Sequence, residues 1–89
     1  MERPLDVGSV VYSRAGRDEG RYYMVYEIVD DSFVTIVDGH LRKLSKPKKK
    51  KLKHLGNYGD VLEGIAEKIK SDKKVYDAEI FSALRKYNS

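Results

Sequence analysis

The residues with the clearest chemical potential in this sequence are cations, and they lie between His40 and Leu55. This stretch holds eight lysines and arginines and no carboxylate. Its net charge is +8, whereas residues 1–39 carry −4 and residues 56–89 are neutral. A positive field confined to one stretch is the electrostatic footprint of a polyanionic partner. A lysine run that is merely solvated is the alternative, and the lack of interspersed acids weighs against it.

A second basic group precedes this stretch, in a loop expected over residues 15–21. Two glycines allow tight or left-handed turns there, and arginines alternate with them. Guanidinium groups contact phosphate bidentately, so the loop suits a phosphate ligand. Both groups together give the candidate nucleic-acid-binding residues, which are Arg14, Gly16, Arg17, Gly20, Arg21, His40, Arg42, Lys43, Lys46, Lys48, Lys49, Lys50, Lys51, Lys53 and His54.

Short strands are expected to position these side chains. Runs of β-branched and aromatic residues predict strands over 7–13, 22–29, 33–37 and 40–44. The last two are expected to form a hairpin, because Asp38-Gly39 is a strong signal for a two-residue turn. Four short strands with tight turns favour a small barrel over a sandwich. Pro47 is expected to end this region, and the lysines at 48–51 to form an extended, self-repelling connector.

The apolar spacing becomes helical after Gly59. Asp60 and Glu63 resemble a capping-box pair at the start of one helix, and Asp77 is expected to begin a second. We expect both apolar stripes to pack on the barrel or on each other. The predicted fold is mainly β with α, a single domain over residues 1–89, with a barrel at 5–46, a basic connector at 47–59 and two helices at 60–88.

Composition excludes several kinds of site. The chain has no cysteine and two histidines, which excludes disulfides, a thiolate nucleophile and a cysteine-based zinc site. Both histidines sit among cations, which disfavours a metal, and no nucleophile–base spacing is present. No apolar run approaches the roughly 20 residues of a membrane span, and the N-terminus lacks the apolar stretch of a signal peptide. We therefore expect a cytoplasmic protein that is no enzyme, has no cofactor or metal, and contacts no membrane.

The order of these segments resembles a known family. A β-branched run at 7–11, the loop Ala15-Gly16-Arg17-Asp18-Glu19-Gly20-Arg21 and the following Met24-Val25 resemble the KOW motif, a strand–loop–strand unit. Ile36-Val37-Asp38-Gly39 and a basic tract ending Lys53-His54-Leu55 are similar to the archaeal and eukaryotic large-subunit ribosomal protein fourteen family and its small bacterial relatives. The resemblance covers about residues 5–55.

This resemblance implies an SH3-like β-barrel followed here by a helical hairpin, and binding to structured RNA, usually ribosomal RNA. Gly16 matches the characteristic glycine, and Arg14, Arg17 and Arg21 occupy basic loop positions. Glu19 stands where a lysine is frequent in the family. The loop is therefore less positive here, and more of the expected RNA binding falls to the lysine tract. Ribosomal proteins are further expected partners. The resemblance says little about the helices.

Three questions stay open at the level of sequence. The main rival function is a protein-interaction module that docks on a ribosomal or transcription factor, with the basic tract serving only solubility. Charge alone also does not separate RNA from DNA. Tyr12, Tyr22, Tyr23 and Tyr26 offer either a ring for base stacking or ordinary core packing.

Overall fold

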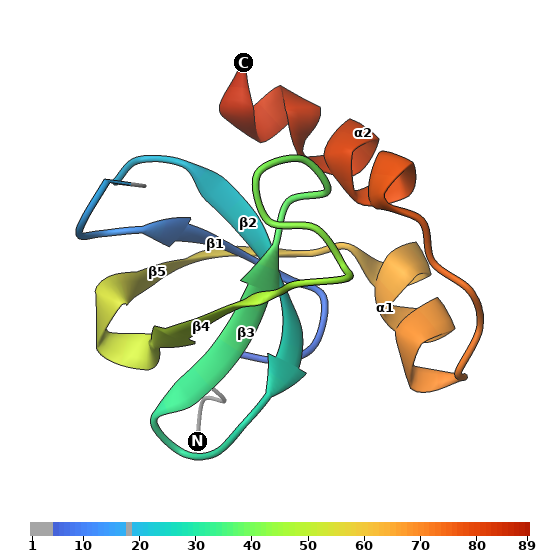
Figure 1. Cartoon of the computed structure of the whole chain (residues 1–89), viewed down its shortest axis with the longest axis horizontal. Coiled ribbons are helices and arrows are strands. Elements are labelled where there is room, and N and C mark those ends of the chain that lie inside the picture. The colour runs from blue at the N-terminus through green and yellow to red at the C-terminus, as the bar shows by residue number, and fades with distance from the viewer. Residues whose placement is uncertain (1–4, 18) are drawn as a thin grey trace.

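A five-stranded antiparallel sheet forms the body of the protein, and two helices cover one face of it (Figure 1). The computed structural model describes residues 5–17 and 19–89, so Asp18 of the predicted loop lies outside the described residues. The strand order is β4-β3-β2-β1-β5. The elements are β1 (Ser9–Ser13), β2 (Tyr22–Ile28), β3 (Phe33–Val37), β4 (Lys48–Lys51), the 3-10 helix η1 (Leu52–His54), β5 (Leu55–Val61), α1 (Glu63–Lys70) and α2 (Asp77–Asn88).

The first three strands confirm the predicted ones to within two residues at each end. Period-two alternation in β2 places Met24 and Tyr26 toward the helices, and Tyr23 and Val25 on the opposite face. Both sets are packed into hydrophobic clusters, so this strand is covered on both sides.

The predicted hairpin after β3 is wrong. Residues 38–47 form a loop, because the carboxylate of Asp38 is used to close a turn. Its Oδ1 accepts the backbone N–H groups of His40 (2.9 Å) and Arg42 (2.7 Å). The backbone N–H of Asp38 also donates to the carbonyl of Arg42 at 2.9 Å. These bonds turn the chain back on itself, so residues 40–44 do not pair with β3.

The partner of β3 is the lysine run, which the sequence had indicated as a connector. Ile36 pairs with Lys48 and Val34 with Lys50 in an antiparallel register. Pro47 directly precedes this strand, a place where its missing N–H costs no ladder bond. The lysines at 48–51 are therefore extended as expected but paired in the sheet, and the segment 47–59, expected as a basic connector, contains β4, η1 and most of β5. Lysine is common on edge strands, where its charge discourages pairing with another chain.

The second helix begins at Asp77 as predicted, whereas the first begins three residues later than expected. Asp60 belongs to β5 and caps no helix. Its carboxylate instead accepts a hydrogen bond from the hydroxyl of Tyr87 in α2, at 2.6 Å. Of the described helices, none combines the length and apolarity needed to cross a membrane.

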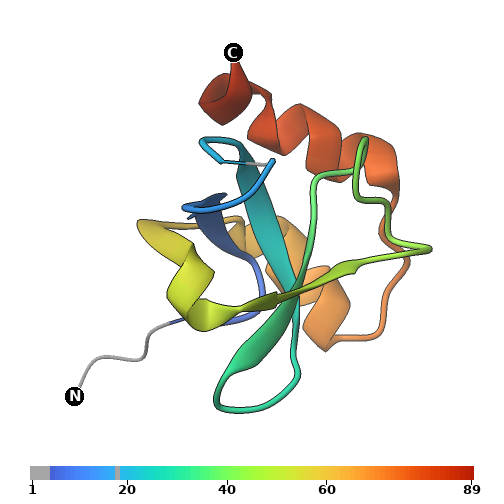
Figure 2. The same ribbon diagram turned by 60° about the vertical axis from the view of Figure 1, so that its left-hand side comes forward.

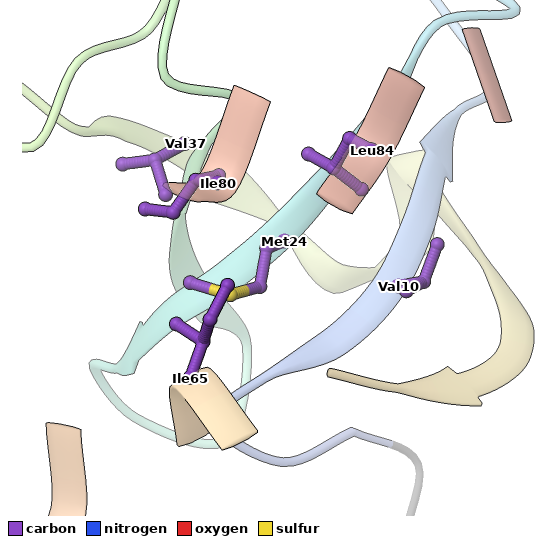
Figure 3. Close-up of a cluster of buried hydrophobic side chains, with 6 residues drawn as sticks. All are labelled: Val10, Met24, Val37, Ile65, Ile80 and Leu84. Carbon is purple, nitrogen blue, oxygen red and sulfur yellow. The ribbon is translucent and has the colours of Figure 1, made fainter. Parts of the chain in front are cut away.

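Two hydrophobic clusters hold these layers together. The first joins the sheet to both helices through side chains of β1, β2, β3, α1 and α2, shown in Figure 3 as Val10, Met24, Val37, Ile65, Ile80 and Leu84. The second lies on the other face of the sheet, which is curved (Figure 2). It includes Val11, Tyr23, Ile36 and Leu55. The mixed β and α class is confirmed. A closed barrel is not, because β4 and β5 remain the edges of the sheet.

Candidate nucleic-acid interface

The loop 14–21 between β1 and β2 contacts two other basic segments that are distant from it in the sequence. They are the loop 38–47 between β3 and β4, and η1, which lie at opposite ends of β4 (Figure 1). The backbone N–H of Arg14 donates to the carbonyl of His54 at 2.8 Å, which joins the first loop to η1. Nη2 of Arg21 lies 3.3 Å from Oδ2 of Asp38, which joins it to the second loop. We call these three segments, together with β4, the basic end.

The arginine loop is a tight, open turn. Gly16 and Gly20 have φ angles of 82° and 89°, and no other atom lies within 4 Å of where a Cβ would stand. The need for glycine is therefore conformational rather than steric. Arg14 and Arg17 are exposed on this turn, whereas Arg21 is half-buried against Asp38. The loop thus offers two guanidinium groups to a ligand and uses the third to hold its neighbour.

A basic hollow of about 480 Å³ lies within the second loop. Its walls are His40, Leu41, Arg42, Lys43, Ser45, Lys46, Pro47 and Lys48. None of these residues is acidic, so the hollow concentrates positive potential. A phosphate group is the ligand that such a lining favours.

The start of α2 supports the walls of this hollow. Oδ1 of Asp77 accepts the backbone N–H of Leu44 at 2.8 Å. Gly39 has a φ of 78°, and a Cβ there would collide with the backbone of Asp77 and Phe81. The helix, which lies outside the region of family resemblance, therefore positions the basic loop.

The four lysines of β4 do not all lie on the same face of the sheet. Directly opposed residues share a face of the sheet, so Lys48 and Lys50 lie on the face of Val34 and Ile36. Lys49 and Lys51 lie on the opposite face, opposed to Thr35 and Phe33.

This alternation divides the predicted site. Lys48 lines the basic hollow. The ammonium of Lys49 instead lies 4.7 Å from the centroid of the Phe33 ring. Lys51 and Lys53 line a second hollow of about 490 Å³, which also includes Asp31. The structure thus brings the candidates of the loop 38–47 together with Lys48, and sets Lys49, Lys51 and Lys53 apart.

The lysines of this region are not neutralised by the molecule itself. Among the described residues, none of the lysines from 43 to 53 has an ion pair with a carboxylate. Arg21 is paired, and Arg42 has a partner as well. The free ammonium groups are therefore available to an external anion.

A cluster of four tyrosines lies beside the root of the arginine loop, and sequence reasoning identified half of it. Tyr22 contacts Tyr12, Tyr58 and Tyr87 with ring centroids 5.7, 5.5 and 5.8 Å away. Tyr23 is fully buried in the core and is unable to stack on a ligand. Asp60 raises the pKa of Tyr87 to about 12 by accepting its hydroxyl proton in a hydrogen bond. Tyr58 and Tyr87 were not among the tyrosines that the sequence indicated for stacking.

No protein-family model matches this chain. The chemical interpretation therefore depends on the geometry. A basic end with open arginines, an acid-free hollow and a neighbouring aromatic cluster has the parts needed to bind an anionic, aromatic polymer.

Proposed function

We propose that this chain is a cytoplasmic, non-enzymatic domain that binds structured RNA, above all ribosomal RNA, through the phosphate backbone. We further propose that its curved sheet is the SH3-like barrel of a KOW protein. The five-stranded antiparallel sheet, which curves around one of its two hydrophobic clusters, supports this. The loop with Gly16 and Gly20 at positive φ, between β1 and β2, supports it too.

The observation that carries the proposal is that the arginine loop links the other basic segments. The backbone N–H of Arg14 bonds to η1, and the side chain of Arg21 bonds to the turn that begins the loop 38–47. Cations from three parts of the sequence are thereby connected to one another. The lysines among them lack carboxylate partners within the described residues.

Recognition would depend on backbone and shape. Lysines are flexible point charges that neutralise phosphates, whereas exposed arginines such as Arg14 and Arg17 add bidentate geometry. Folded RNA presents phosphates at spacings set by its shape, so a rigid basic end selects among folds rather than among sequences.

Binding to ribosomal RNA fragments over a salt series tests the proposal. If about five cations each neutralise one phosphate, log affinity falls against log salt with a slope of roughly −3.5 to −4.5. Duplex DNA of equal length, added as a competitor, separates RNA recognition from general attraction to polyanions. A flat salt dependence, or equal competition by DNA, contradicts the proposal.

One observation favours the rival function of protein docking. Leu41 and Phe81 are 53% and 43% exposed, and the ring of His40 lies 5.5 Å from that of Phe81. An exposed apolar pair beside a basic hollow also suits a protein partner. Replacing Lys48 to Lys51 with glutamate separates the two functions. If the chain binds RNA, ribosome association should be lost; if it docks through the apolar pair, ribosome association should be kept.

A further inference from the structure

A bulge in β5 places one tyrosine outside the regular sheet. Ser9 pairs with Val61 and Val11 with Asn57, so two steps along β1 correspond to four along β5. The extra residues are held in a turn, because Oδ1 of Asn57 accepts the N–H of Gly59 at 2.9 Å and Gly59 has a φ of 106°. Bulges of this kind re-aim a side chain. The side chain re-aimed here belongs to Tyr58.

The ring of Tyr58 is both exposed and fixed in place. It is 50% exposed, although its edge-to-face neighbours Tyr22 and Tyr87 have centroids only 5.5 and 5.2 Å away. Edge-to-face contacts define the orientation of a ring. An aromatic surface that is held rigid before binding loses little entropy when a ligand stacks on it.

Charges of both signs lie beside this ring. The carboxylate of Asp60, which accepts a hydrogen bond from Tyr87 at 2.6 Å, disfavours a phosphate next to it. The ammonium of Lys86 lies 5.3 Å from the centroid of the Tyr87 ring and attracts a phosphate. A nucleotide bound here would place its phosphate toward Lys86 and its base on Tyr58.

We propose that Tyr58 is a stacking platform for an unpaired base, so that the RNA partner combines a folded stem with an extruded nucleotide. This inference rests on the proposed function and specifies its substrate class. Base–aromatic stacking is tolerant of sequence, since every base has a π face. The site would therefore read the presence of an unpaired base rather than its identity.

Two hairpin RNAs that differ in one base test this proposal. One carries a single bulged adenosine, and the other carries an abasic residue at the same position, so the backbones are identical. We expect the wild type to prefer the adenosine hairpin, and Tyr58→Ala to lower affinity for it by roughly 5- to 100-fold while leaving the abasic hairpin unaffected. Tyr58→Phe retains the ring and should retain the preference. Tyr76→Ala, at a tyrosine that is 58% exposed and outside the cluster, is the matched control.

A spectroscopic measurement keeps the proposal testable if Tyr58→Ala fails to fold. The chain has no tryptophan, so Tyr58→Trp introduces a single fluorophore at the platform. Stacking should quench its emission with the adenosine hairpin and not with the abasic one.

The outcomes separate the two proposals. If the wild type binds neither hairpin, or binds without salt dependence, the proposed function itself fails. If the wild type binds both equally, or Tyr58→Ala weakens both by the same factor, RNA binding stands and the stacking platform is refuted. Equal quenching by both hairpins refutes it as well.

Discussion

The lysines of the basic end and those of α1 differ in whether a carboxylate is paired with them. Nζ of Lys68 lies 2.7 Å from Oε1 of Glu79, and Nζ of Lys70 lies 3.5 Å from Oδ2 of Asp6. The hydrogen bond from Lys68 also holds the pKa of Glu79 below its ordinary value. At the basic end, the lysines from 43 to 53 have no such partners among the described residues. Exposed pairs contribute little to stability. The difference is therefore one of availability, since the two lysines of α1 are paired with carboxylates and the lysines from 43 to 53 are not.

The two regions are nonetheless coupled. Asp77 at the start of α2 accepts the N–H of Leu44, and Gly39 packs against the backbone of the same helix. The helical side thus holds the shape of the basic hollow without contributing to its charge. The following variants change the charge of the basic end, its support by the helices, or the hydrogen bond between α2 and β5.

Charge reversal in the hollow should have the largest effect. Lys46→Glu with Lys48→Glu should lower affinity for structured RNA by about 100-fold or more, because each lost charge-assisted contact costs roughly 1.5–3 kcal/mol. Lys73→Glu with Lys74→Glu changes net charge equally, at exposed residues between the helices. Titration of both variants in one buffer measures the difference. Equal losses would mean that net charge alone drives binding.

Neighbouring lysines of β4 give a sharper contrast. Lys48 lines the hollow, whereas the ammonium of Lys49 lies over Phe33 on the other face of the sheet. We expect Lys48→Glu to lower RNA affinity about tenfold and Lys49→Glu to lower it clearly less. Salt titrations should show a shallower slope for the first variant only. A larger effect at Lys49 would place the RNA on the opposite face.

Weakening the helix support should have a moderate effect. Asp77→Ala removes the acceptor for Leu44, at a cost of about 1 kcal/mol in the free energy of unfolding, and should reduce RNA affinity several-fold as the hollow loosens. Asp77→Asn removes the same negative charge and keeps an acceptor oxygen. Urea unfolding and RNA titration compare the two. If both variants bind alike, the helix does not shape the hollow.

The smallest effect is expected from the bond between Tyr87 and Asp60. The folded state raises the pKa of Tyr87 from its ordinary value of 10.0 to about 12, so it binds the phenolic proton more tightly than the unfolded chain. The resulting stability is fully present below about pH 10 and is lost as pH rises toward about 12. The difference in unfolding free energy between wild type and Tyr87→Phe should shrink over that interval, as measured by urea unfolding. A constant difference would show that the bond is not linked to this titration.

The sequence predicted those elements whose local pattern agrees with their tertiary role. β3 alternates β-branched residues and was predicted at its observed bounds, Phe33–Val37. The strand formed by the lysines was not predicted, because lysine has a low strand propensity. It pairs here with β3, whose side chains Val34 and Ile36 are buried and whose backbone groups require hydrogen-bond partners. The hairpin predicted from Asp38-Gly39 is also absent because of contacts outside the dipeptide. The carboxylate of Asp38 closes a local turn, and Gly39 packs on α2.

The candidate site shows the same division. The cations were visible as composition, so most of the basic end could be identified from the sequence. Alternation along β4, which separates Lys48 from Lys49, required the strand to be known. Tyr58 depended on a bulge set by the register between β1 and β5, a relation between distant residues that no local pattern reports.

One hydrogen-bonded pair gives the molecule a built-in reporter of tertiary assembly. The ladder between β2 and β3 stops at Met24 and Val37, and the amide of Asn88 serves Tyr22 in its place, with bonds of 2.8 and 3.1 Å. A side chain at the end of α2 thus stands in for the next residue of a strand. Solvent exchange of the Tyr22 amide hydrogen consequently measures how often this helix lifts from the sheet. Comparing that exchange rate with and without RNA would show whether ligand binding is transmitted to the helix.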